Sequence, residues 1–204
     1  MRKLFIALFI LTTALTNAQT IDDIFKTMPK DILPGITDGN RTMLLVDTGK
    51  TTIPYELGTV EKLTDKEDYL KVKTSAIGTT EIKLLPIKGG KKIICVTKTV
   101  CGKACDSNIT FYSYAWEKLD QKTFLPEISK NSFMDSSKKD SETYKYAVSL
   151  PDICPISAEF INGGTDLQLT LHYKDYLSER QQQEIKPFIK TDVIVLKWNN
   201  EFFK

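Results

Sequence analysis

From residue 51 onward the sequence alternates apolar and polar residues, and this period of two limits the fold more than any other feature. Leu70, Val72 and Thr74 alternate with lysine and serine, and side chains two apart point to the same face of a strand. Alternation, or a short run of β-branched and aromatic residues, also marks residues 93–96, 109–116, 144–150, 167–173 and 193–198. We therefore predict a mainly antiparallel β body.

Short helices accompany this body, so the predicted fold class is α+β with two N-terminal helices before the strands. Thr20 is the predicted N-cap of the first helix and Pro29 follows its end; its apolar face is Ile21, Ile24, Phe25 and Met28. Asn40 is predicted to cap the second helix. A third short helix interrupts the strands, because Ser178 and Gln181 have the spacing of a capping box.

The first 18 residues have the three parts of a secretory signal peptide. Arg2 and Lys3 precede an apolar run over residues 4–15, and Ala18 offers a small residue before the cut. A twelve-residue helix spans only about 18 Å, short of the roughly 30 Å hydrocarbon core. We therefore expect cleavage after Ala18, export of residues 19–204, and no transmembrane segment in the mature chain.

The charge of the mature chain argues against polyanionic partners. The full sequence has 28 basic and 26 acidic residues, and the signal segment contributes Arg2 and Lys3 but no acid. The mature chain is therefore neutral, without the broad positive field that gathers nucleic acid or anionic lipid. We predict no nucleic-acid partner.

Four cysteines, all in the mature part, agree with an oxidising compartment. If one strand runs from Cys95 to Cys101, these two are about 20 Å apart and cannot be bridged. A loop with Gly102 separates Cys101 from Cys105, so this is the favoured disulfide, and Cys95 and Cys154 are left as the second pair. A redox motif and a four-cysteine zinc site are the alternatives.

Two parts of the mature chain resemble each other. Residues 51–126 and 144–204 each hold a Gly-Gly turn, two strands separated by a polar insert, a tryptophan and then a phenylalanine. A polar loop over residues 130–143 joins them. We interpret residues 19–204 as one domain, and the two segments as candidate related β modules.

Most catalytic signatures are missing. His172 is the only histidine, and strand alternation points it away from Leu167, Leu169 and Leu171. There is no Gly-x-Ser-x-Gly elbow, no phosphate-binding loop and no dinucleotide fingerprint. We assign no catalytic, cofactor-binding or metal-ligating residue. Paired carboxylates stay open, with Asp65, Glu67, Asp68 and Glu81 available.

Two groups of residues resemble a known family. The first is Phe25, Met28-Pro29, Ile32-Leu33-Pro34, Asn40-Arg41 and Leu45-Val46-Asp47; the second is Thr99-Val100-Cys101 with Cys105-Asp106-Ser107, before an aromatic strand ending at Trp116. Together they resemble an exported family of Gram-negative anaerobes catalogued only as domain of unknown function 3256. The resemblance implies export to the periplasm, the outer membrane or the extracellular space, and it implies no site residues.

Two classes of function are consistent with these observations. The first is a non-enzymatic exported module that binds a protein or an envelope component, and a small-ligand carrier is a variant of it. Tyr112, Tyr114 and Trp116 are its candidate contact stripe, if they lie in one row on a strand. The alternative is an envelope hydrolase that uses paired carboxylates.

Overall fold

The computed structural model describes residues 20–46, 49–56, 58–151 and 153–204. The predicted signal segment and its cleavage site lie outside these residues. Among the described residues, no helix is long and apolar enough to cross a membrane.

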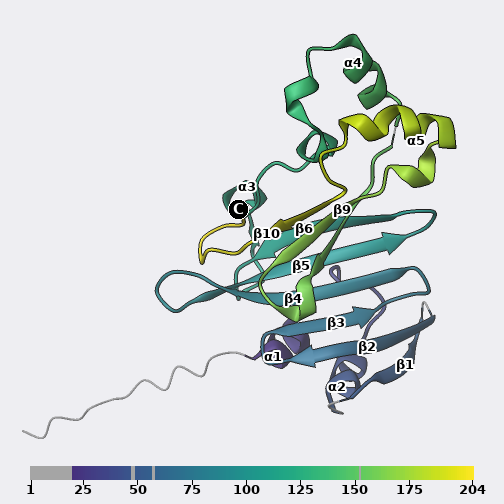
Figure 1. The fold of residues 1–204 in the computed structure, drawn as a ribbon. Coiled ribbons are helices and arrows are strands. Elements are labelled where there is room, and N and C mark those ends of the chain that lie inside the picture. Colours follow the sequence, from purple (N-terminus) through teal and green to yellow (C-terminus); the bar gives the residue numbers. More distant parts are fainter. Residues whose placement is uncertain (1–19, 47–48, 57, 152) are drawn as a thin grey trace, which may run out of the picture.

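Seven antiparallel strands form the main sheet, and they neighbour one another in chain order (Figure 1). They are β1 (Thr51–Tyr55), β2 (Gly58–Lys66), β3 (Tyr69–Lys73), β4 (Gly78–Pro86), β5 (Lys92–Cys101), β6 (Cys105–Tyr112) and β7 (Lys118–Leu119). A second sheet of three antiparallel strands has the order β10-β9-β8, from β8 (Ile156–Phe160), β9 (Leu167–Leu171) and β10 (Val193–Leu196). The predicted α+β class with a mainly antiparallel β body is confirmed.

The two N-terminal helices are present. In α1 (Ile21–Thr27), Thr20 and Asp23 form a capping box, and the chain turns extended at Met28 just before Pro29. The second, α2 (Asp38–Val46), begins before the predicted cap Asn40, because Thr37 Oγ1 accepts a hydrogen bond from the Asn40 N–H at 3.2 Å. The predicted helix at Ser178 is α5 (Glu179–Ile185), and it has the predicted capping box with Gln181.

The strand predicted over residues 144–150 is wrong, because this segment is the helix α4 (Glu142–Ser149). Ser141 caps it by accepting from the Tyr144 N–H at 3.1 Å, and Ala147 is its buried residue. Tyr144 and Val148 are also four residues apart, so the short pattern of Tyr144, Tyr146, Val148 and Leu150 fits a helix as well as a strand. The segment predicted as a polar loop holds two 3₁₀ turns, Lys130–Phe133 and Ser136–Lys138.

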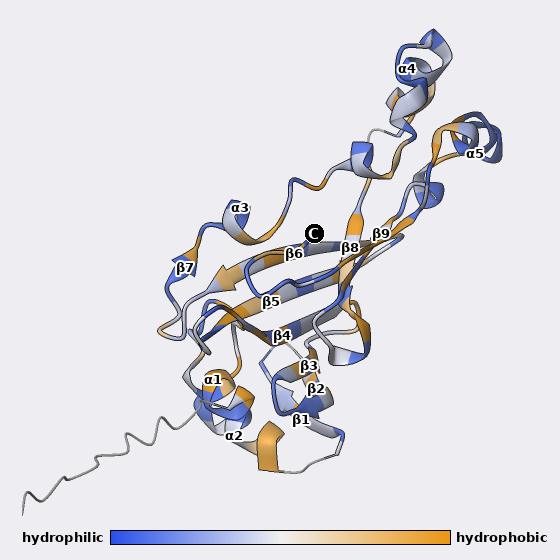
Figure 2. Ribbon diagram, turned by 60° about the vertical axis from the view of Figure 1, so that its left-hand side comes forward, coloured by the Kyte–Doolittle hydropathy of each residue, from blue (hydrophilic) through white to orange (hydrophobic). Residues whose placement is uncertain are grey.

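Both faces of the main sheet are buried. One face packs against α1 and α2, and the strand residues of this core include Leu70, Ile82, Leu84, Ile94 and Val96. The other face packs against the small sheet through residues such as Ile93, Phe111, Phe160 and Leu169. The helices α4 and α5 lie together at the end of the molecule away from α1 and α2 (Figure 2). This burial on both sides explains the continuous apolar run at residues 93–96.

The small sheet meets the main sheet through the outer edge of β8. Its alternate N–H groups donate to side chains of the main sheet: Ile156 to Asp106 at 3.0 Å, Ala158 to Ser107 at 2.8 Å and Phe160 to Glu81 at 3.0 Å. Side-chain acceptors thus take the place of a further strand and satisfy buried backbone donors. The candidate β modules, residues 51–126 and 144–204, contribute their strands to different sheets, and their relationship stays a prediction.

Candidate ligand pocket

The favoured disulfide closes the hairpin between β5 and β6. Cys101 and Cys105 face each other across the two strands, and their sulfur atoms are 2.04 Å apart. Cys95 and Cys154 are free thiols in the structure, so the second pairing is not formed. Burial raises the pKa of both thiols, which leaves them as thiols rather than the reactive thiolates of a redox site.

The three aromatic residues of the candidate contact stripe do not lie in one row. Strand β6 ends at Tyr112, and Trp116 has a left-handed φ of 62° within the following turn. The rings of Tyr112 and Trp116 pack edge to face at 5.4 Å, and Trp116 Nε1 donates to Thr27 Oγ1 of α1 at 3.3 Å. All three residues are half-buried against the core under the helices, while Tyr114 also lines the pocket described below.

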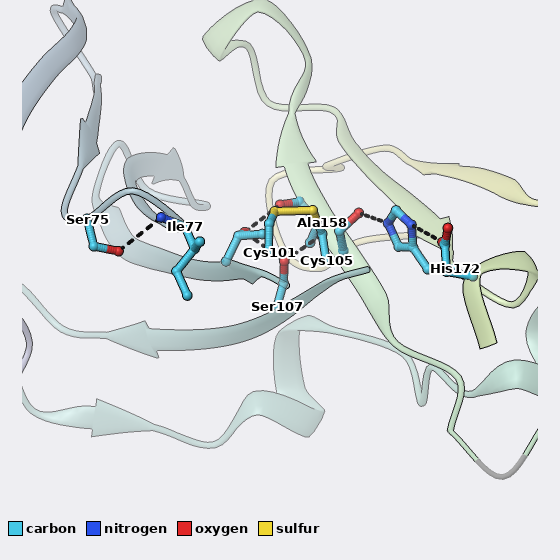
Figure 3. The surroundings of a disulfide bond; sticks show 10 residues. Ser75, Ile77, Cys101, Cys105, Ser107, Ala158 and His172 are labelled. Atoms are coloured by element: carbon cyan, nitrogen blue, oxygen red, sulfur yellow. Dashed lines mark hydrogen bonds and ion pairs between the residues drawn. A yellow bond between two sulfur atoms is a disulfide. The ribbon is translucent and has the colours of Figure 1, made fainter. Parts of the chain in front are cut away.

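His172 lies beside the disulfide with two polar partners (Figure 3). Its Nε2 is 2.9 Å from Ser157 Oγ, and its Nδ1 is 3.8 Å from Asp175 Oδ2. As predicted, it lies on the face of β9 opposite to the buried leucines, since Leu167, Leu169 and Leu171 belong to the core. The order serine, histidine and aspartate is that of a nucleophile, a base and an orienting acid.

This trio lacks the other parts of an acyl-transfer centre. Asp175 is beyond hydrogen-bond distance of the ring. The N–H groups of Ile156 and Ala158, on either side of the serine, already donate to Asp106 and Ser107. Neither can stabilise an oxyanion without breaking the contact between the sheets, although such donors provide a large part of catalysis in acyl transfer.

The carboxylates considered for hydrolysis are largely paired with lysines. Asp65 bonds Lys62 at 3.0 Å, Asp68 bonds Lys83 at 2.8 Å and Glu81 bonds Lys71 at 3.1 Å. Glu67 and Asp65 do share a cavity of about 360 Å³ with Asp22. Burial, and then the charge of Asp65, raise the pKa of Asp22. This cavity therefore brings three acidic residues together, with the pKa of one of them raised.

An apolar cavity with a volume of about 510 Å³ lies at the other end of β5 from the disulfide. Five segments line it: the β4–β5 turn, the start of strand β5, the β6–β7 loop, strand β7, and α3 (Gln121–Phe124). Its apolar wall is Ile87, Ile93, Tyr114, Leu119 and Phe124. The volume is within the range of about 300–1,000 Å³ typical of small-molecule sites.

Aromatic packing holds this wall in place. The Phe124 ring contacts Phe111 at 5.1 Å and Trp198 at 6.4 Å between ring centroids. Trp198 Nε1 donates to the Pro86 carbonyl at 2.6 Å, and the Phe203 N–H donates to the Phe124 carbonyl at 2.8 Å. The C-terminal segment therefore fixes the floor of the pocket, which is formed before any ligand arrives.

The rim of the pocket is positively charged. Lys91 is exposed and Lys92 is half-buried, and no acidic residue lines the cavity. Gly89 and Gly90, with φ of 83° and 74°, make the turn that brings these lysines to the rim. Tyr114 makes no hydrogen bond through its hydroxyl within the described residues, and burial raises its pKa.

Comparison with known proteins assigns the chain to a family. A family model described as "Protein of unknown function (DUF3256)" matches residues 13–203. The chain belongs to the DUF3256 family. The DUF3256 chain is similar to a solved structure described as a domain of an uncharacterized protein from Porphyromonas gingivalis W83. The TM-score is 0.79 at 22% identity, over 90% of this chain and 96% of that chain. This likeness concerns the fold. The comparison with curated proteins returned no match.

Sequence reasoning did not find the pocket of the DUF3256 chain. Its lining residues come from positions 87–124, and no pattern along the chain shows that the β4–β5 turn lies beside α3. Residues 88–92 look like an ordinary solvated turn. The available signal was the combination of two glycines and three lysines with a flanking isoleucine on each side.

Proposed function

We propose that this chain is an exported, non-enzymatic binding module whose ligand site is the apolar pocket between the β4–β5 turn and α3. The observation that carries the proposal is the pocket itself: a cavity of about 510 Å³ with an apolar wall contributed by five segments. Pockets of this kind bury most of a small apolar ligand and need few polar groups. The ligand is an envelope component with an apolar part, so the chain acts as a carrier or sensor of that component.

Binding of a neutral apolar dye tests this function. N-phenyl-1-naphthylamine should give a saturable rise in fluorescence with the mature protein. Leu119→Glu, which places a charge against the apolar wall, should weaken binding at least about tenfold, because a buried unpaired carboxylate is costly. Val195→Glu is the matched control, since Val195 is an exposed valine on β10 outside the pocket.

Circular dichroism establishes that both variants are folded before binding is compared. A wild-type protein that shows no saturable binding refutes the proposed function. Equal binding by the wild type and Leu119→Glu would place the dye elsewhere and refute the pocket as the site.

Export is the second part of the proposal. It is supported by the basic start, the apolar run and the small residue Ala18, and by a disulfide at Cys101 and Cys105. N-terminal sequencing of protein from the envelope fraction should begin at Gln19. Recovery of the chain in the cytoplasm with Met1 intact would contradict export.

A carboxylate-dependent hydrolase is the second candidate, favoured by the cavity that holds Asp22 and Asp65. The raised pKa of Asp22 suits an acid, and Asp65, which bonds Lys62 at 3.0 Å, is the second carboxylate. This candidate predicts a hydrolytic activity that Asp22→Asn and Asp65→Asn abolish and that Leu119→Glu leaves unchanged.

A further inference from the structure

We infer that the pocket takes an amphipathic anion, a single apolar chain or ring that ends in one carboxylate or phosphate group. This inference rests on the proposed function and names the class of its ligand. The apolar part would occupy the cavity, and the headgroup would lie at the rim beside Lys91, Lys92 and Tyr114.

The lysines that line the pocket differ from three buried or half-buried lysines of the main sheet, because the described residues give them no acidic partner. Lys62, Lys71 and Lys83 each bond a carboxylate within 3.1 Å. Lys91 and Lys92 have no acidic partner within 4.0 Å among the residues that the structure describes. An apolar cavity lined by two lysines and no acidic residue favours an anion over a neutral or cationic headgroup.

Tyr114 lines the same cavity and adds a hydroxyl as a neutral donor. Burial raises the pKa of Tyr114, so the hydroxyl keeps its proton at neutral pH and can donate to an anionic oxygen. The described residues give it no hydrogen-bond partner, so a headgroup at the rim would be its acceptor.

The size of the cavity sets a second expectation. A homologous series of fatty acids should bind more tightly by about three- to fourfold for each added CH₂ until the cavity is full, because burial of one CH₂ contributes about 0.8 kcal/mol. Binding of longer members should then level off.

Competition against the neutral dye tests the charge preference. Dodecanoate and dodecyl phosphate should displace N-phenyl-1-naphthylamine at concentrations at least about tenfold lower than dodecanol or dodecyltrimethylammonium. The advantage of the anions should shrink as salt is raised. The double variant Lys91→Glu/Lys92→Glu should lose it and still bind the dye. Lys139→Glu/Lys190→Glu, which makes the same change at two exposed lysines outside the pocket, should keep it.

Trp198 reports where the chain of the ligand lies. The sequence has two tryptophans, and Trp198 contacts the pocket residue Phe124. In the Trp116→Phe variant, 11,12-dibromododecanoate should quench the emission of Trp198, and Leu119→Glu should remove the quenching.

These experiments distinguish failure of the anion preference from failure of the proposed binding function. If the dye binds in the pocket but dodecanol displaces it as well as dodecanoate, the inference is overturned and the binding function stands. An unchanged anion preference in Lys91→Glu/Lys92→Glu also overturns the inference. If no apolar probe binds the wild type, both fall together.

Discussion

Replacing Gly163 by alanine should lower the free energy of unfolding by about 3 kcal/mol. Gly163 has a φ of 68°, and a Cβ atom there would lie 2.5 Å from the Tyr69 ring. The Gly163 carbonyl also accepts from the buried Lys83 ammonium at 2.8 Å. The turn cannot move away from Tyr69 without losing this bond. Urea denaturation followed by tryptophan fluorescence measures the change.

Gly89→Ala is the matched control for this prediction. Gly89 has a similar φ of 83°, but nothing lies within 4 Å of the added Cβ. It should therefore cost only the backbone strain, about 1–2 kcal/mol. Equal losses for the two variants would show that contact with Tyr69 contributes nothing and that the small sheet is not anchored there.

Replacing Glu81 by alanine should also lower the free energy of unfolding by about 3 kcal/mol. The buried Glu81 is the partner of a lysine in the main sheet and of a backbone N–H in the small sheet, and the variant leaves both without it. Glu81 is 2% exposed. Its carboxylate bonds Lys71 at 3.1 Å and accepts from the Phe160 N–H at 3.0 Å. The variant leaves that N–H without an acceptor at the edge of β8. Thermal and urea denaturation of the purified mature chain measure the loss.

Glu159 offers a control on the same lysine. It bonds Lys71 at 2.6 Å but is 61% exposed, so Glu159→Ala should cost no more than about 1 kcal/mol. A loss as large as that of Glu81→Ala would mean that the ion pair with Lys71, rather than the hydrogen bond to β8, accounts for the lost stability.

The pH dependence of stability gives an independent check on Glu81. Burial is the largest influence on this carboxyl and raises its pKa above the ordinary 4.5, against the opposing effects of the Phe160 N–H and Lys71. The folded chain therefore keeps this proton to a higher pH than the unfolded chain does. The contribution of Glu81 is largest below about pH 4.5 and falls as pH rises through the folded-state pKa. The stability of the wild type relative to Glu81→Gln should therefore decrease as the pH rises above about 4.5. A difference that grows with pH would contradict the dominance of burial.

Sequence patterns predicted those elements that are stabilised by interactions between near neighbours in the chain. The capping boxes at Thr20 and Ser178 and the bridged hairpin at Cys101 depend on residues within five positions of one another. The same reasoning failed over residues 144–150, where a helix and a strand share the apolar spacing and packing of Ala147 into the core decided for the helix. The strand predicted over residues 109–116 was also too long, because β6 ends at Tyr112. Trp116 lies in the following turn with a left-handed backbone and donates a hydrogen bond to α1.

By itself, the sequence determined the class of fold, the strands β3, β5 and β6 of the main sheet and the absence of the familiar catalytic motifs, because periodicity and capping act between near neighbours along the chain. The tertiary structure alone decided which polar groups meet. The edge of β8 lies on Glu81 and Ser107, Ser157 lies beside His172, and the β4–β5 turn forms one pocket with Phe124. These partners are separated by 15 to 79 positions or belong to different elements. Their contact depends on how the two sheets and the C-terminal segment pack, and only the balance of burial and hydrogen bonding over the whole chain sets that arrangement.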